Sequence, residues 1–218
     1  VYIPGSPEKI QKAREKYVPA FTEHFKNVGI QFDSSIIITP EMDSGEAQKA
    51  VKEASFIMLM GGDPFKQKEM CEKLGLLEEL KKYDGLMLGF SAGAMLMSKH
   101  IIITPCSEEY PEFHIEEGLN LDGISIYPHN NTNQEEYPNT LVVGDETYQK
   151  EDLLKVANEY GEYYLLQDCL REDGLTDVSI IKSTNGSLEF YIENDGRVWL
   201  VKSGEINLTN SISKAIKK

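Results

Sequence analysis

Residues 86–94, with the sequence LMLGFSAGA, decide the fold of this chain. The apolar run over 86–90 is too short for a helix and too apolar for an exposed edge, so it predicts a central strand. A helical pattern over 92–99 follows it. Between the two, Gly89-Phe90-Ser91-Ala92-Gly93 has the form G-x-S-x-G, in which small residues flank a serine at a tight strand-to-helix turn. Such a turn presents the serine oxygen at the carboxyl edge of a sheet, with a free backbone N–H at the helix start behind it.

Short apolar runs alternate with helical patterns on both sides of this turn. This alternation is typical of strand-helix-strand units around a parallel sheet. We expect strands at 1–3, 36–39, 56–60, 101–104, 124–127 and 163–167, and helices after Ser6, over 44–53, 65–83 and 150–160. The sequence therefore predicts an α/β fold with a mostly parallel sheet flanked by helices.

The pattern changes towards the carboxyl end of the chain. Three further strands are expected at 177–182, 187–192 and 198–202, joined by Asn185-Gly186 and Asp195-Gly196, which are strong hairpin signals. We expect them to form a small antiparallel β meander. No linker separates it from the rest, so the prediction is one domain over 1–210, followed by a frayed tail over 211–218.

Composition limits the classes of partner. The 218 residues are 40% hydrophobic and 27% charged, which is typical of a globular domain. A net charge of −14 would repel phosphate backbones, and no apolar run approaches the roughly 20 residues of a membrane span, so we expect neither nucleic acid nor a membrane as partner. Three cysteines without a Cys-x-x-Cys pair favour a reducing cytoplasm and no thiolate metal site. The sequence leaves the oligomeric state open, a homodimer included.

A serine nucleophile needs a general base, and the chain has four histidines: His24, His100, His114 and His129. The first three fall in an amphipathic helix, at a helix end and in an acidic loop, where a surface or partly buried role is the simpler interpretation. His129 differs because it follows a predicted strand and Pro128, and strand carboxyl ends are where open α/β sheets assemble their sites. It is our predicted base.

The order of residues along the chain bears on the third member of a triad. In α/β-hydrolases the triad acid lies between the serine and the histidine in the sequence. In this chain the acid would then have to lie between Ser91 and His129, and the histidine would follow the serine after only a short segment. The order serine, histidine, acid is more natural, and Asp168, directly after the predicted strand 163–167, is the best candidate. Glu162, Asp173 and Asp177 are the alternative candidates for the acid. For Ser91, the alternative interpretation is a serine that only caps the following helix.

Three motifs in order, Met60-Gly61-Gly62-Asp63-Pro64-Phe65, Gly89-Phe90-Ser91-Ala92-Gly93-Ala94 and Tyr127-Pro128-His129, resemble the peptidase E family of serine peptidases. The resemblance runs along nearly the whole chain. It implies a fold similar to class I glutamine amidotransferases, of the flavodoxin-like kind, and relationship to cyanophycinase. It also implies Ser91 as nucleophile, His129 as base and Asp168 as acid. The backbone N–H groups of Gly62 and Ala92 would form the oxyanion hole. The alternative interpretation of Gly61-Gly62 is a turn with no catalytic role.

The chain also departs from its relatives. Glutamine amidotransferases have a cysteine at the elbow and a histidine followed by x-Glu, whereas this chain has Ser91 and His129-Asn130-Asn131, which disfavours glutaminase activity. Aspartyl dipeptidases of the family are understood to hold an N-terminal aspartate with an arginine beyond the histidine. Between His100 and Gln149 this chain has no lysine or arginine and ten acidic residues, so we expect no preference for Asp-X peptides.

These patterns predict a cytoplasmic serine peptidase that acts on short peptides and uses no cofactor and no metal. An esterase or isopeptidase on the same triad is one alternative. A non-enzymatic binding protein that keeps the fold is another.

Overall fold

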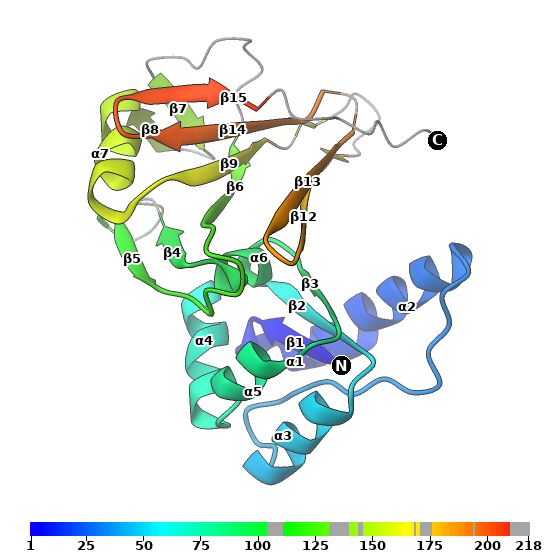
Figure 1. Cartoon of the computed structure of the whole chain (residues 1–218). Helices are drawn as coiled ribbons and strands as arrows, with labels where there is room; N and C mark the ends of the chain where they lie inside the picture. Colours follow the sequence, from blue (N-terminus) through cyan, green and yellow to red (C-terminus); the bar gives the residue numbers. More distant parts are fainter. Residues whose placement is uncertain are drawn as a thin grey trace. The chain divides into compact units, whose positions relative to one another are not determined.

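The computed structural model describes residues 1–103, 111–130, 140–143, 146–167, 169–170, 176–193 and 195–209. It divides into two compact units, Val1–Met97 and Ser98–Lys218 (Figure 1). The single domain over 1–210 stays a prediction, and the proposed tail over 211–218 lies outside the described residues.

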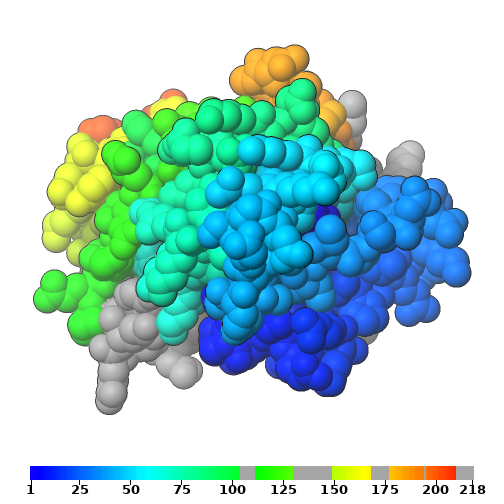
Figure 2. Space-filling view, turned by 90° about the horizontal axis from the view of Figure 1, so that it is seen from below, coloured from blue at the N-terminus to red at the C-terminus, as the bar shows by residue number. Residues whose placement is uncertain are grey.

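The first unit contains a parallel sheet in the order β1-β2-β3, which confirms the predicted strand-helix-strand arrangement. The elements of this unit are β1 (Tyr2–Gly5), η1 (Pro7–Lys9), α1 (Ile10–Lys12), η2 (Ala13–Tyr17), α2 (Val18–Asn27), α3 (Ser44–Glu53), β2 (Phe56–Gly62), α4 (Pro64–Lys73), α5 (Leu77–Lys82), β3 (Leu86–Gly89) and α6 (Ala92–Met97). The surface of this unit is coloured blue to teal in Figure 2.

Both faces of this sheet are covered, as the apolar character of its strands requires. One face packs against η2 and α2, in a cluster that includes Tyr2, Met58 and Met60 from the strands and Val18 from α2. The other face contacts α4 and α6. Strand β2 is buried from Phe56 to Met60 because it lies between β1 and β3.

Two strand predictions in this unit need correction. The segment 36–39 makes only an isolated parallel bridge from Ile37 to Tyr2, because a single pair of hydrogen bonds around Tyr2 joins it to β1. Within the sheet of this unit β3 is not the central strand: among the described residues it pairs with β2 alone, and Leu86 is 68% exposed. Its apolar run reflects the packing of Leu88 against the cluster around Met58 rather than burial on every side.

In its described residues the second unit contains one larger sheet, several hairpins and one helix. Its elements are β4 (His100–Ile103), β5 (His114–Glu117), β6 (Ile126–Asn130), β7 (Thr140–Val143), β8 (Glu146–Gln149), α7 (Lys150–Tyr160), β9 (Tyr163–Gln167), β10 (Cys169–Leu170), β11 (Thr176–Asp177), β12 (Ser179–Thr184), β13 (Ser187–Ile192), β14 (Arg197–Lys202) and β15 (Glu205–Leu208). The sheet has the order β15-β14-β9-β6, with β6 parallel to β9 and the other pairs antiparallel.

Apolar side chains pack on both faces of this sheet. Helix α7 covers one face, where Leu153 and Val156 join the cluster around Trp199 and Leu165. Leu166 and Val198 form a second cluster with side chains of β12 and β13, among them Phe190. The predicted helix 150–160 and strand 163–167 appear with the expected bounds.

The carboxyl-terminal strands form hairpins rather than one continuous meander. Strands β12 and β13 pair through Asn185 and Gly186, whose φ values of 52° and 77° fit the predicted turn. Strand β14 pairs instead with β9 and β15, because its apolar residues Trp199 and Val201 join the core under α7. None of the helices in the described ranges has the length and apolar character needed to cross a bilayer.

Candidate active site

Ser91 lies at a sharp elbow between β3 and α6, as its motif predicts. Its φ is 53°, in the left-handed region that non-glycine residues rarely adopt. Its carbonyl accepts the N–H groups of Ala94 (3.0 Å) and Met95 (3.1 Å), so the helix begins directly behind the serine. A strained serine between strand and helix is the geometry of a nucleophile elbow.

The two glycines of the motif are required by close backbone packing around this elbow. A Cβ on Gly93 would lie 2.0 Å from the carbonyl oxygen of Leu59 in β2, and a Cβ on Gly89 would lie 2.6 Å from the Ala94 nitrogen. Neither contact is possible for a real side chain. The sequence pattern therefore records a steric need of the first unit.

Gly61 and Gly62 are the last two residues of β2, and the chain turns here into α4, which begins at Pro64. A Cβ on Gly61 would lie 3.5 Å from Ser91 Cβ, so this turn is adjacent to the elbow. Gly62 has a φ of 140°, and a Cβ there would lie 2.4 Å from the Gly5 carbonyl carbon. This position accepts glycine alone, both for its φ and for its close approach to β1.

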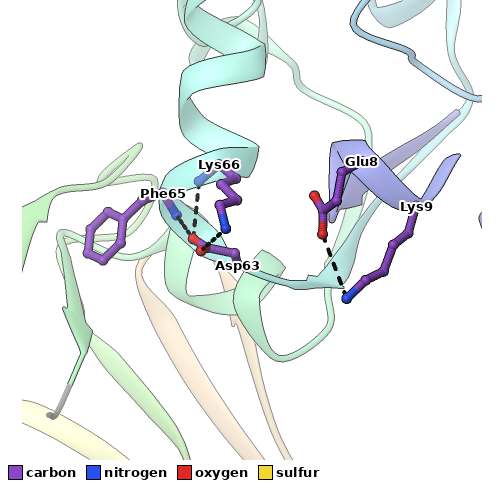
Figure 3. Close-up of polar contacts among 5 residues, drawn as sticks. All are labelled: Glu8, Lys9, Asp63, Phe65 and Lys66. Atoms are coloured by element: carbon purple, nitrogen blue, oxygen red, sulfur yellow. Dashed lines mark hydrogen bonds and ion pairs between the residues drawn. The ribbon is translucent and has the colours of Figure 1, made fainter. Parts of the chain in front are cut away.

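Asp63 fixes the start of the helix that follows this turn. Its Oδ1 accepts the backbone N–H groups of Phe65 (2.9 Å) and Lys66 (3.1 Å), and its Oδ2 lies 3.5 Å from Lys66 Nζ (Figure 3). The N-cap and Pro64 at the first helical position together define where α4 begins. The same view shows Glu8 and Lys9 on η1, which form a separate exposed ion pair at 3.7 Å.

Ala92 is the first residue of α6, and its N–H is one of the groups that have no acceptor inside a helix. The next N–H, of Gly93, donates to Phe90 O at 3.0 Å. The predicted oxyanion donors, Gly62 and Ala92, thus come from the two adjacent turns at the carboxyl edge of β2 and β3.

His129 lies on β6 in the second unit and also has a positive φ, of 63°. Tyr127 pairs with Leu165 and Asn130 pairs with Gln167, so Pro128 and His129 together stand opposite the single residue Leu166. This is a β-bulge, a device that redirects a side chain out of the strand pattern. The strand contains His129 rather than ending before it, and the histidine is exposed.

The acid candidates have different positions relative to His129. Asp168 follows Gln167, the Cα partner of Asn130, and lies outside the described residues, as does Asp173. Glu162 precedes the opposite end of β9, about 17 Å along the strand from Gln167 at roughly 3.3 Å per residue. That distance makes Glu162 unsuitable as a partner of His129.

Asp177 is a buried carboxylate at the carboxyl end of β9. It is 1% exposed, its Cα pairs with that of Cys169, and its Oδ2 accepts the N–H of Asp195 at 3.4 Å. Gln167 donates to Asp195 O at 3.3 Å and accepts from Trp199 Nε1 at 3.3 Å. This network supports the strand end next to His129.

The structure thus brings Gly62, Ser91 and Ala92 together in the first unit, and it places His129 beside Gln167 in the second. The remaining histidines have ordinary surroundings. His114, predicted in a loop, lies on β5 with Nε2 3.0 Å from Glu116 Oε1, and His100 packs edge-on to Tyr160. Burial lowers the pKa of His100.

One buried polar residue close to the glycines at the end of β2, Gln67, was not predicted from the sequence. Gln67 is fully buried, and its Nε2 donates to Ile3 O (2.7 Å) and Met60 O (3.2 Å). It stands on the buried stripe of α4 with Pro64 and Met70. A polar residue on an otherwise apolar helix face is the signal that could have found it.

Within the described ranges, no group of three or more histidine, cysteine or acidic side chains is arranged to hold a metal ion. Cys71, on α4, is buried, and burial raises the pKa of its thiol to about 12. A thiol of this kind is a packing group rather than a nucleophile. Cys106 lies outside the described residues.

Comparison with known proteins gives a family match and several solved structures with a similar fold, among them two peptidases. Residues 1–160 match the model of Peptidase family S51. A peptidase from an acI-B1 Actinobacterium is 18% identical, covers 97% of this chain and 82% of its own, and has a TM-score of 0.57. A candidate peptidase E protein from Listeria monocytogenes EGD-e is 18% identical over 98% of this chain and 85% of its own, with a TM-score of 0.47. No curated protein matches the sequence.

Proposed function

The chain belongs to peptidase family S51 and is a serine-type peptidase, and from this premise we propose that it hydrolyses short peptides through a Ser91-His129-Asp168 triad. The observation that best supports Ser91 is its backbone: a positive φ at a strand-to-helix elbow, held by the contact of Gly93 with Leu59. A serine that only capped α6 would need neither the strain nor that contact.

The proposed reaction has two halves. Ser91 Oγ attacks the scissile carbonyl while His129 takes its proton, and the protonated imidazole then gives that proton to the departing amine as the C–N bond breaks. Water, deprotonated by His129, hydrolyses the acyl-enzyme. Asp168 holds the imidazole in the useful tautomer, and the N–H groups of Gly62 and Ala92 stabilise the oxyanion.

An activated serine can be tested directly with a fluorophosphonate probe, because only a nucleophilic serine is phosphonylated. We expect labelling of the wild-type protein at Ser91, together with cleavage of a mixed dipeptide library, and neither in Ser91→Ala. Ser55→Ala, which removes an exposed serine before β2, is the matched control and should behave as wild type. Labelling without peptide cleavage would favour an esterase, and no labelling would favour a binding protein.

The proposed specificity excludes a preference for an N-terminal aspartate. Recognition of that carboxylate normally uses the fork of an arginine. Arg14 lies exposed in η2, Arg197 Nη1 donates to Gly196 O at 3.2 Å, and Arg171 lies outside the described residues. We expect kcat/KM for Asp-Leu to be no higher than for Leu-Leu or Lys-Leu at one salt concentration. A strong preference for Asp-Leu would contradict this and make Arg171 the first residue to mutate.

A further inference from the structure

The ladder between β1 and β2 breaks opposite Met60 and Gly61, near the end of β2. Tyr2 pairs with Met58 and Ile3 with Leu59, but the next pair is Gly5 with Gly62, so the register shifts across Pro4. Proline has no N–H and cannot donate to a ladder. The Met60 carbonyl, which stands opposite Pro4 at this break, therefore needs another donor.

Gln67 supplies that donor from α4. Its side-chain Nε2 bridges the two strands, donating to Ile3 O on β1 at 2.7 Å and to Met60 O on β2 at 3.2 Å. The amide is 0% exposed, and its Oε1 has no hydrogen-bond partner among the described residues. An unpaired buried oxygen carries a cost, so packing alone does not favour glutamine at this position.

The bridge fixes the strand one residue before the turn, and a second contact fixes it one residue after. Met60 is held by Gln67, and Asp63 N donates to Gly5 O at 2.7 Å. Gly61 and Gly62 lie between these two points. Gln67 at Met60 and the pairing with Gly5 thus hold the backbone on the two sides of these glycines.

We propose that Gln67 is a positioning residue of the active site, which aims the backbone N–H of Gly62 at the oxyanion by bridging the carbonyls of Ile3 and Met60. This inference rests on the oxyanion role proposed for Gly62. Oxyanion donors are effective only when they are fixed in place before the reaction. A small displacement of this turn therefore reduces the stabilisation of the transition state more than the binding of the substrate.

The test compares Gln67→Met with Gln48→Met in the full chain. Methionine keeps the length of the side chain and removes the amide. Gln48 Nε2 also donates to a carbonyl, that of Leu74 at the far end of α4 (3.2 Å), so its loss is a matched structural defect away from the turn. Urea unfolding gives the fraction folded of each variant under assay conditions.

We expect Gln67→Met to lower kcat by roughly 10- to 100-fold with KM within about twofold, since a displacement of about 1 Å can cost 10²-fold. Gln48→Met should keep wild-type kcat and KM. A folded Gln67→Met protein with wild-type kcat, or equal losses of kcat in both variants, would overturn the proposal. If the wild-type protein lacks both peptidase activity and fluorophosphonate labelling, the proposed function fails instead.

Gln67→Glu keeps the proposal testable if Gln67→Met does not fold. A protonated carboxyl can donate to one of the two carbonyls, whereas a carboxylate is repelled by both. The ratio of its kcat to that of the wild type should therefore fall as the pH rises, with the fraction folded measured at each pH. A ratio that does not change with pH would count against the positioning role.

Discussion

The serine elbow of the first unit and the histidine bulge of the second both place a non-glycine residue at positive φ, 53° at Ser91 and 63° at His129. The means differ. At the elbow, backbone packs on backbone, and Gly93 is required because a Cβ would lie 2.0 Å from Leu59 O. At the bulge, the positive φ of His129 results from the strand register, because two residues of β6 stand opposite one residue of β9.

This difference determines how each region responds to substitution. A conformation held by steric exclusion is sensitive to any added atom. A conformation held by strand register depends on the partner strand, β9. It also depends on the hydrogen bonds at the end of β9, where Gln167 and Asp177 both bind the backbone of Asp195. The predictions that follow separate these two kinds of support.

The largest effect is expected from the two residues at positive φ. Ser91→Ala and His129→Ala should each reduce kcat by roughly 10⁴-fold or more, because members of a triad act as a unit. For the same reason Ser91→Ala/His129→Ala should be hardly worse than either single variant. Single-turnover assays of the three variants measure this, and losses that multiply in the double variant would argue against a partnership.

The next effect distinguishes the two acids near the end of β9. Asp168→Asn should lower kcat by up to about 10⁴-fold, as expected where a triad acid fixes the histidine tautomer. Asp177→Asn should lower kcat and the free energy of unfolding much less, because its amide oxygen can still accept the Asp195 N–H that Asp177 Oδ2 accepts at 3.4 Å. Kinetic assays and urea unfolding of both variants would show the reverse pattern if Asp177 were the acid.

The sequence predicted the elbow better than the bulge, for a physical reason. The contacts at the elbow demand glycine, so they leave the pattern Gly89-Phe90-Ser91-Ala92-Gly93. The bulge demands no residue type, and Tyr127-Pro128-His129 predicted a strand end where the strand continues. Local signals succeeded where structure is local, as at Asn185-Gly186 and over the helix 150–160.

What sequence could not supply depends on contacts between distant residues. The apolar run over 86–90 predicted a central strand, but the place of β3 in the sheet depends on pairing with β2 and not on its own composition. Gln67 was missed because its partners, Ile3 and Met60, come together only when β1 and β2 pair around Pro4. A single sequence predicts the buried stripe of α4. It does not predict the break in the β1–β2 ladder, where Gln67 donates its hydrogen bonds.

A smaller effect compares steric exclusion with backbone strain. Gly93→Ala should cost about 3 kcal/mol of unfolding free energy, the upper part of the range for overpacking, and should also lower kcat because the elbow must shift. Gly123→Ala in the second unit adds a Cβ with nothing within 4 Å, so only its φ of 73° counts, at about 1–2 kcal/mol. Its kcat should stay at the wild-type value. Equal stability losses, or an unchanged kcat in Gly93→Ala, would show that the elbow tolerates added atoms.

The smallest effect uses Cys71 to report on packing in the first unit. Burial raises the pKa of its thiol from 9.0 to about 12, with a smaller contribution from the charge of Glu72. Above pH 9 the thiol therefore ionises in the unfolded chain but stays protonated in the folded one, so the unfolded state binds fewer protons and stability falls as the pH rises. The linked loss is about 1.4 kcal/mol per pH unit at most. Urea unfolding of the wild type and of Cys71→Ala at pH 8, 9 and 10 isolates this contribution, because other groups titrate alike in both proteins. We expect the stability difference between them to narrow above pH 9, and a difference that stays constant would mean that the thiol is not shielded by the packing around α4.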